Sequence, residues 1–263
     1  MRTIAIINQK GGVGKTTTAV NLAASLASMK RRILLLDLDP QGNATMGCGV
    51  NKRELTHSAC DLMLGDLEFR DCVVRVDEPV PGFDLIPANG DLTAAEVGLM
   101  QTSQRERRLR QVLADLGDSY EFVIIDCPPS LNMLTVNALV AAQGVLIPIQ
   151  CEYLALEGLG QLMVTVQRVQ SSLFPELSIR GVVLTMFLGR TNLARGVETE
   201  VRRFFPDKVF NTIIPRSIAL AEAPSYGRPI SVYAPENIAA RAYQALAREI
   251  MEQDGIKLPA LPA

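Results

Sequence analysis

The chain has 263 residues, of which 48% are hydrophobic and 21% are charged, and its formal net charge at pH 7 is −2. This composition is ordinary for a globular protein and excludes disordered and fibrous classes. The length is sufficient for a large buried core, and the nearly neutral charge means that nucleic-acid binding would need a local basic patch.

Apolar runs rich in β-branched residues alternate with segments of helical periodicity along the chain. Continuous apolar runs are typical of parallel strands that helices cover on both faces. In chain order, the predicted elements are a strand at Thr3–Asn8, a helix at Lys15–Met29, strands at Ile33–Asp37 and Phe122–Asp126, a helix at Asn132–Ala142, strands at Val145–Ile149 and Ile179–Phe187, a helix at Leu193–Phe205, a strand at Val209–Ile214, and a helix at Pro235–Gln253 with proline in its first turn.

This alternation predicts an α/β fold with a doubly wound, mostly parallel twisted sheet and helices on both faces. No break in composition divides the chain, so we expect residues 1–263 to form a single domain and residues 257–263 to form a flexible tail. The apolar run at Ile4–Ile7 is too short for a signal peptide. The uncharged window Cys127–Gln150 contains prolines and amides that favour a helix and a strand over a membrane span. We therefore expect a cytoplasmic protein.

The five cysteines are scattered and form no C-x-x-C pair. Such a set favours reduced thiols that pack as small apolar residues.

A glycine-rich segment joins the first predicted strand to the first predicted helix. Glycines let successive backbone N–H groups turn toward phosphate oxygens, and the positive end of the helix dipole favours the same anions. We expect Lys15 to neutralise the β- and γ-phosphates and the Thr16 hydroxyl to coordinate Mg²⁺. The predicted nucleotide-binding residues are Lys10, Gly11, Gly12, Val13, Gly14, Lys15, Thr16 and Thr17.

The loop departs from the pattern G-x-x-x-x-G-K-[ST], because Gln9 occupies the first glycine position and Lys10 adds a second lysine. With the segments LLLDLDPQGNAT, IIDCPPSL, QCEYLALEGL and IPRSIALAEAPSYG, the loop resembles the deviant Walker A ATPases. Within them, the chain resembles the ParA/Soj family of chromosome- and plasmid-partitioning ATPases.

The resemblance implies a P-loop NTPase fold, ATP and Mg²⁺ as cofactors, and hydrolysis of ATP to ADP and phosphate. It also implies an ATP-dependent homodimer in which Lys10 reaches the nucleotide of the partner subunit. Further implied partners are a centromere-binding protein of the ParB type, which would stimulate hydrolysis, and double-stranded DNA bound without sequence preference. The implied location is cytoplasmic and nucleoid-associated, with no membrane partner.

Three aspartates end two of the predicted strands. Asp37 and Asp39 are expected on the same side of the chain, at the carboxyl edge where open α/β sheets bind ligands. By resemblance, Asp39 orients or activates the attacking water and Asp37 supports the Mg²⁺ site. Asp126 stands at the usual place of the Walker B acid and is expected to hold Mg²⁺ through water. The predicted catalytic residues are thus Lys10, Lys15 and Asp39, and the predicted metal-site residues are Thr16, Asp37 and Asp126.

Adenine is expected between the ends of the strands Ile179–Phe187 and Val209–Ile214. In similar proteins the segment that matches Ile214-Pro215-Arg216-Ser217 touches the base, so Pro215 and Ser217 are candidate contacts. An ordinary proline turn at the end of a strand is the alternative.

The segment Arg180–Arg216 contains seven cationic and three anionic side chains, a net charge of +4. A basic face of this kind can bind DNA phosphates, and solvated helix charge is the alternative. Arg190 and Arg216 are the candidate DNA contacts.

Other functions on this fold were compared with partitioning. A membrane-associated ATPase of the MinD kind needs a C-terminal amphipathic helix, which Asp254–Ala263 does not offer. The nitrogenase iron protein needs cluster-ligating cysteines, and Cys127 does not match that spacing. A metabolic ligase or kinase stays open, because a fold alone does not determine chemistry. The sequence favours the partitioning ATPase.

Overall fold

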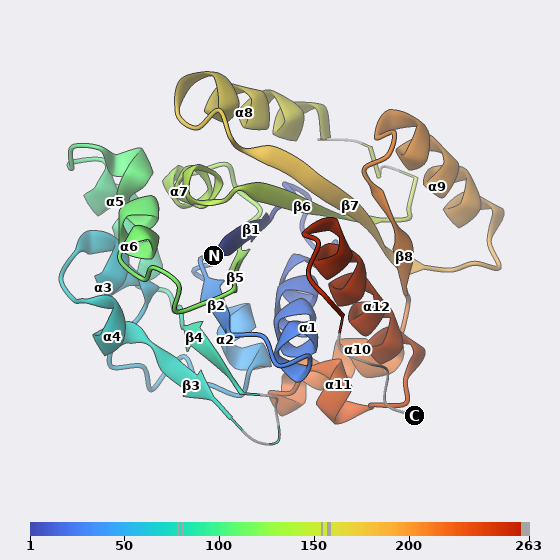
Figure 1. Cartoon of the computed structure of the whole chain (residues 1–263), viewed down its shortest axis with the longest axis horizontal. Helices are drawn as coiled ribbons and strands as arrows, with labels where there is room; N and C mark the ends of the chain where they lie inside the picture. Colours follow the sequence, from blue (N-terminus) through green and yellow to red (C-terminus); the bar gives the residue numbers. More distant parts are fainter. Residues whose placement is uncertain (78, 80–81, 154, 157–158, 259–263) are drawn as a thin grey trace.

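The computed structural model describes residues 1–77, 79, 82–153, 155–156 and 159–258. Its strands form one eight-stranded sheet in the order β3-β4-β2-β5-β1-β6-β7-β8 (Figure 1). All pairs of neighbouring strands are parallel except β3 with β4, at one edge. The strands are β1 (Arg2–Ile6), β2 (Ile33–Asp37), β3 (Val74–Val76), β4 (Phe83–Ile86), β5 (Phe122–Asp126), β6 (Gly144–Gln150), β7 (Ser178–Phe187) and β8 (Val209–Pro215).

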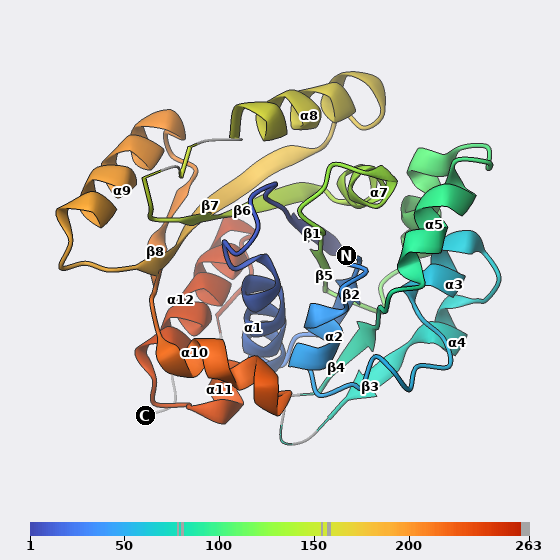
Figure 2. The same cartoon turned by 180° about the vertical axis from the view of Figure 1, so that it is seen from behind.

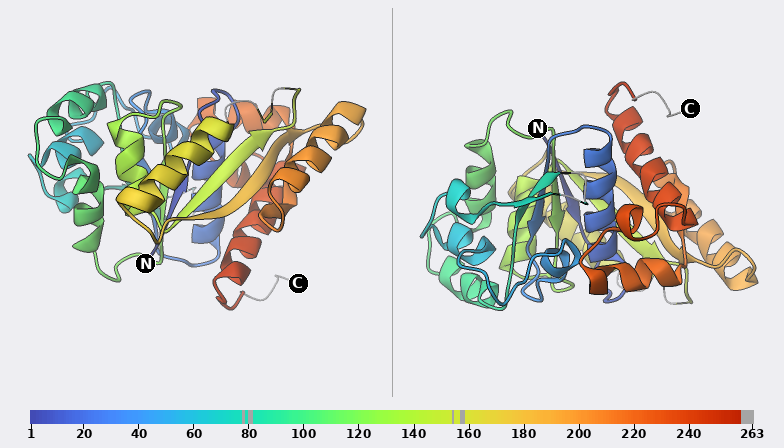
Figure 3. Two further views of the ribbon diagram at one scale, coloured as in Figure 1. Left: turned by 90° about the horizontal axis from the view of Figure 1, so that it is seen from above. Right: turned by 90° about the horizontal axis from the view of Figure 1, so that it is seen from below.

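Helices cover both faces of the sheet, as the apolar runs predicted (Figures 2 and 3). One face packs against α1 (Lys15–Ser28), α2 (Asn43–Gly47), α10 (Ile218–Glu222), α11 (Ile230–Tyr233) and α12 (Ile238–Gln253). The other face packs against α3 (Ala59–Leu64), α4 (Phe69–Cys72), α5 (Leu92–Leu99), α6 (Arg108–Ala114), α7 (Met133–Ala141), α8 (Leu159–Ser172) and α9 (Asn192–Phe204). Two 3₁₀ turns, η1 (Arg105–Arg107) and η2 (Ala223–Tyr226), join neighbouring helices.

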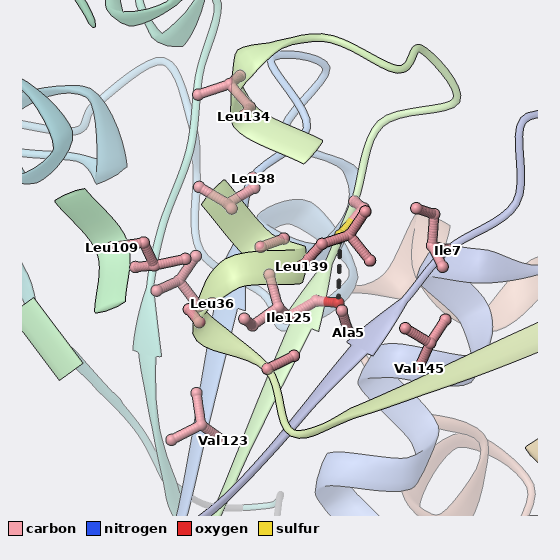
Figure 4. Packing of buried hydrophobic residues seen from close by; sticks show 14 of the residues in the cluster. Ala5, Ile7, Leu36, Leu38, Leu109, Val123, Ile125, Leu134, Leu139 and Val145 are labelled. Atoms are coloured by element: carbon pink, nitrogen blue, oxygen red, sulfur yellow. Dashed lines mark hydrogen bonds between the residues drawn. The ribbon is translucent and has the colours of Figure 1, made fainter. Parts of the chain in front are cut away.

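The apolar core is divided between the two faces because successive side chains of a strand point in opposite directions. In β2, Leu34 and Leu36 belong to the cluster under α5–α9, whereas Ile33 and Leu35 belong to the cluster under α1 and α12. Figure 4 shows part of the first cluster, where Leu139 of α7 lies over the central strands. Double burial therefore explains why these strands lack polar alternation.

The order of the strands indicates where in the sheet a ligand binds. β1 lies between β5 and β6, and the chain continues to β2 on one side of β1 and to β6–β8 on the other. Ligands bind at the carboxyl ends of the strands at such a switch point. The loops that follow β1, β2 and β5 therefore meet at one place.

Two boundaries differ from the sequence prediction by more than one residue. β1 ends at Ile6, because the Asn8 side chain donates to Pro148 O at 2.8 Å and accepts from Lys10 N at 3.0 Å, which turns the chain. The last helix begins at Ile238 and not at Pro235. Its N-cap is Asn237, whose side chain accepts from Ala239 N at 2.9 Å, so the predicted proline in the first turn was wrong.

The sequence prediction also omitted the strands β3 and β4 and the helices α2–α5, α8, α10 and α11. Of the predicted tail, residues 259–263 lie outside the described residues. Leu258 packs against the apolar cluster of α12, and Lys257 O accepts from Arg31 Nη2 at 3.1 Å. Within the described ranges, no helix is both long and apolar enough to span a membrane.

All five cysteines are buried and free, as expected of thiols that pack as apolar residues. Burial raises the pKa of each of them, which leaves the thiols protonated at neutral pH.

Candidate active site

The glycine-rich loop between β1 and α1 is open at the positions where phosphate is expected. Gly12 and Gly14 have positive φ angles of 73° and 88°, and a Cβ atom built at Gly11 or Gly12 meets no atom within 4 Å. Gly14 is the N-cap of α1, which has no side-chain cap and no acidic residue in its first turn. The first N–H groups of α1 therefore have no side-chain acceptor at the cap, and the positive end of the helix is free to attract an anion.

Lys15 lies at the start of α1, directly after the loop. The Lys15 side chain is buried at 7% exposure, and its Nζ donates to Lys10 O at 3.3 Å. Burial lowers the pKa of Lys15, while the charges of Asp126 and Asp39 act in the opposite direction. The ammonium group thus stands between the backbone of its own loop and the acidic groups of the neighbouring strands.

Asp126 ends β5 next to this loop and is fully buried. Neither of its carboxylate oxygens has a hydrogen-bond partner in the part of the chain that the structure describes. Burial, followed by the charge of Asp37, raises the pKa of Asp126 well above its ordinary value. Thr16 and Lys15 are near enough to lower that pKa, although no hydrogen bond of ordinary geometry joins Thr16 to the carboxylate.

Asp37 ends β2, pairs in register with Asp126, and is also fully buried. Its carboxylate accepts from Asp39 N at 3.1 Å and from the Thr45 amide and hydroxyl, each at 2.8 Å. Burial raises the pKa of Asp37 to about 6, and these hydrogen bonds oppose the shift. Asp39 is nearly buried at the same edge, where it accepts from Gln41 N at 2.9 Å. The sequence therefore predicted correctly that the three aspartates come together.

The donors at this edge fit a magnesium ion. The described residues contain no group of three or more His, Cys, Asp and Glu side chains arranged to hold a metal ion alone. Mg²⁺ is usually bound by one or two carboxylates together with phosphate oxygens and waters, so no such cage is required. The unpartnered Asp126 carboxylate and the adjacent Thr16 hydroxyl are oxygen donors of the type that this ion prefers.

A cavity of about 240 Å³ lies between the carboxyl ends of β7 and β8, where adenine was expected. Pro215 and Ser217 both line it. The Ser217 hydroxyl already donates to Asn237 Oδ1 at 3.2 Å and accepts from Leu220 N at 3.4 Å as the N-cap of α10. Pro215 thus offers an apolar surface, while the Ser217 hydroxyl is engaged within the fold.

Sequence reasoning missed Thr185 and Tyr243. Thr185 lines the cavity, and its hydroxyl donates to Val13 O of the phosphate loop at 2.8 Å. The buried Tyr243 lines the same cavity and has its hydroxyl 3.3 Å from Thr18 Oγ1. Tyr243 interrupts an alanine- and leucine-rich stripe of α12, and this pattern was a usable signal for a polar group with a buried partner.

The basic segment Arg180–Arg216 does not form one face. Arg180 is the third residue of β7 and lies at the amino ends of the strands, where its Nη2 is 2.8 Å from Asp254 Oδ2. Arg202 and Arg203 of α9 pair with Glu198 and Glu200 at 3.0 and 2.6 Å. Among the described residues, the candidate DNA contacts Arg190 and Arg216 make no ion pair, and both follow the carboxyl ends of strands. The pair with Asp254 therefore lowers the net charge of the segment below +4, and Arg190 and Arg216 lie on the nucleotide side of the sheet.

Comparison with known proteins shows the family to which the chain belongs. Residues 1–179 match the model of the AAA domain family. The chain is 50% identical to the sporulation initiation inhibitor protein Soj of Bacillus subtilis, over 94% of this chain and 97% of that protein. It is 47% identical to the chromosome partitioning protein ParA of Caulobacter vibrioides, over 97% and 95% of the two chains.

Among solved structures, the chain is similar to a cobyrinic acid a,c-diamide synthase of Mycobacterium smegmatis with a bound ATP analogue and magnesium. That match has a TM-score of 0.84 and 38% identity and covers 100% of both chains. The identity to the partitioning proteins is higher and extends over nearly the whole chain. The chain therefore belongs to the ParA/Soj family of chromosome-partitioning ATPases.

Proposed function

We propose that this chain is an ATP-dependent dimerising switch that binds DNA without sequence preference and drives the segregation of a chromosome or plasmid. Residues 1–263 act as one ATPase domain on the nucleoid in the cytoplasm, and a ParB-type centromere-binding partner stimulates hydrolysis. The observation that supports ATP hydrolysis best is the buried, unpartnered carboxylate of Asp126 beside an open phosphate loop. The family to which the chain belongs supports the segregation role.

The site residues have distinct roles in this proposal. Residues 10–17 bind the phosphates, and Lys15 neutralises charge on the β- and γ-phosphates. Thr16 and Asp126 hold Mg²⁺, which adds positive charge at the phosphates when bound, and Asp37 supports that site. Pro215 and Ser217 flank adenine.

Asp39 orients the attacking water through its carboxylate. Phosphoryl transfer depends mainly on such positioning and on electrostatic stabilisation. Lys10 reaches the nucleotide of the partner subunit, as an arginine finger does in other NTPases.

Nucleotide binding is tested by Lys15→Ala. The substitution removes the buried ammonium group of the loop, so we expect a fluorescent ATP analogue to lose measurable affinity. Lys30→Ala is the matched control, because Lys30 lies beyond the other end of α1. Wild-type affinity in Lys15→Ala contradicts the assignment of the phosphate site.

DNA binding is tested by Arg190→Glu, with Arg70→Glu as the control. Arg70 is an exposed arginine of α4, far in sequence from the basic segment. We expect wild type to shift random-sequence DNA with ATP and not with ADP, and Arg190→Glu to weaken binding to all sequences alike. Each lost phosphate contact should flatten the slope of log K against log[salt] by about 0.9. Equal binding with ATP and ADP, or an unchanged affinity in Arg190→Glu, contradicts the DNA-binding proposal.

The structural similarity to the diamide synthase supports an amide-forming ligase as the second candidate function. The two candidates differ in what stimulates the release of phosphate from ATP. A switch hydrolyses ATP without any carboxylic-acid substrate and responds to DNA and a centromere-binding partner. A ligase releases phosphate only in proportion to the amide formed from cobyrinic acid and a nitrogen donor. Phosphate release with DNA, with the centromere-binding partner, and with cobyrinic acid plus ammonia distinguishes them.

A further inference from the structure

The short segment from Asp39 to Thr45 is bound at both ends by one carboxylate. The two oxygens of Asp37 bind its two ends, because Oδ1 accepts from Asp39 N and Oδ2 accepts from both the amide and the hydroxyl of Thr45. These bonds are 2.8–3.1 Å long, and Thr45 is completely buried. The loop that carries Asp39 is thus closed on a single fixed group.

The same segment is attached to the residues that follow β4. The Thr45 hydroxyl, which donates to Asp37, accepts from the buried Ala88 N at 2.8 Å. Gly42 has a φ angle of 59°, and a Cβ atom built there would lie 2.4 Å from Ala88 O. Only glycine fits this approach without displacing the backbone. One hydroxyl therefore uses its donor and an acceptor position to join β2, residues 40–45 and the end of β4.

We propose that Thr45 is a positioning residue for hydrolysis, and that Asp37 acts by holding Thr45 and Asp39 and not as a ligand of Mg²⁺. This inference rests on the proposed role of Asp39 toward water. Two of the hydrogen bonds to Asp37 come from groups of Thr45 and the third from the amide of Asp39 itself. Any shift of Thr45 therefore moves the backbone that carries the Asp39 carboxylate. A displacement of about 1 Å at a reacting group can lower the rate by about 10²-fold.

The substitution Thr45→Val tests the clamp, because valine has the shape of threonine but neither donates to Asp37 nor accepts from Ala88. We expect kcat to fall by about 10- to 100-fold, while the KM for ATP stays within about threefold of wild type. Thr45→Ser keeps the hydroxyl and should restore most of kcat. Thr3→Val is the matched control, because Thr3 is equally buried in β1 at the opposite edge and its hydroxyl has no partner among the described residues.

Asp37→Asn provides a second measurement. The clamp predicts a lower kcat with an unchanged Mg²⁺ concentration for half-maximal activity, whereas a metal ligand predicts that this concentration rises at least about tenfold. Such a rise overturns the inference. A wild-type kcat in Thr45→Val, with the wild type active, also overturns it. Absence of ATP hydrolysis in the wild-type protein contradicts the proposed function instead, so the two failures are distinguishable.

Amide hydrogen exchange keeps the test independent of activity. In Thr45→Val, the Ala88 amide should exchange much faster than in wild type, while the amides within α1 keep their protection. Unchanged protection of Ala88 overturns the inference, because the hydroxyl would then not be its partner.

Discussion

The strands β2 and β5 both end in a buried aspartate, and the two aspartates differ in their hydrogen bonds. Asp37 and Asp126 are paired in register on neighbouring strands, and both are fully buried. Asp37 accepts three hydrogen bonds from its own chain, whereas Asp126 accepts none from the described residues. Leaving a buried polar group without a partner costs about 1–3 kcal/mol, and more for a charge. The Asp37 carboxylate therefore holds neighbouring parts of the chain, whereas the Asp126 carboxylate is available to a ligand.

The largest effect should follow from Asp126→Asn. If Asp126 holds Mg²⁺, this change should lower Mg²⁺ affinity and ATP hydrolysis by about 10- to 100-fold or more. Steady-state hydrolysis over a Mg²⁺ titration measures both quantities. Asp118→Asn, in an exposed loop before β5, is the control for the loss of one negative charge. Unchanged Mg²⁺ dependence in Asp126→Asn would remove the contrast between the two carboxylates.

Removal of Mg²⁺ provides a second test of the difference between Asp37 and Asp126. At a concentration 100 times its Kd, Mg·ADP should stabilise wild type by about 2.7 kcal/mol, and EDTA should remove the part that depends on the metal. Asp37→Asn should keep this metal-dependent stabilisation, and Asp126→Asn should lose it. Thermal unfolding with ADP, with and without Mg²⁺, measures the effect. If Asp37→Asn lost the metal-dependent stabilisation and Asp126→Asn kept it, Asp37 would be the residue that holds the metal.

In the absence of ligands, the two substitutions should change stability in opposite directions. Asp37→Asn breaks hydrogen bonds to buried amide and hydroxyl groups and should lower the free energy of unfolding by about 1–3 kcal/mol. Asp126→Asn removes an unpartnered buried carboxylate that repels Asp37, so it should raise that free energy by about 1 kcal/mol or more. Urea unfolding of the nucleotide-free protein checks both signs. A loss of stability in both variants would show that Asp126 has a partner in solution.

The smallest effect concerns Ser217, whose hydroxyl, like the Asp37 carboxylate, is engaged by the chain itself. Loss of this N-cap in Ser217→Ala should cost about 0.5–2 kcal/mol of stability. The Kd for ATP should stay within about threefold of wild type, because the cavity wall at Pro215 is unchanged. Equilibrium titration with a fluorescent ATP analogue measures it. A tenfold weaker affinity would instead indicate direct contact between this hydroxyl and the base.

Much of the active edge could be predicted because it is encoded by short, contiguous patterns. The observed bounds of β2 and β5 are those that the apolar runs indicated, since double burial leaves a continuous signal in few residues. The phosphate loop was equally readable, because the glycines that it needs are adjacent in sequence. By contrast, the short strands β3 and β4 were missed, because three or four residues give too few positions to show a period.

The sequence by itself determined the six longer parallel strands, the position of the phosphate loop and the aspartates that end β2 and β5. These features depend on local pattern and on the rule that parallel strands end at one edge. Only the tertiary structure decided where the arginines lie and which groups the aspartates bind. The part of β7 from Arg180 to Phe187 spans about 23 Å and lies between Arg180 and Arg190, which divides the basic segment. Likewise, Thr45 and Ala88 are 43 positions apart, and only packing brings the Ala88 amide to the Thr45 hydroxyl. Asp37 and Asp126 each end a short apolar strand in the sequence, and the hydrogen bonds that Asp37 accepts from Asp39 and Thr45 make them different in the structure.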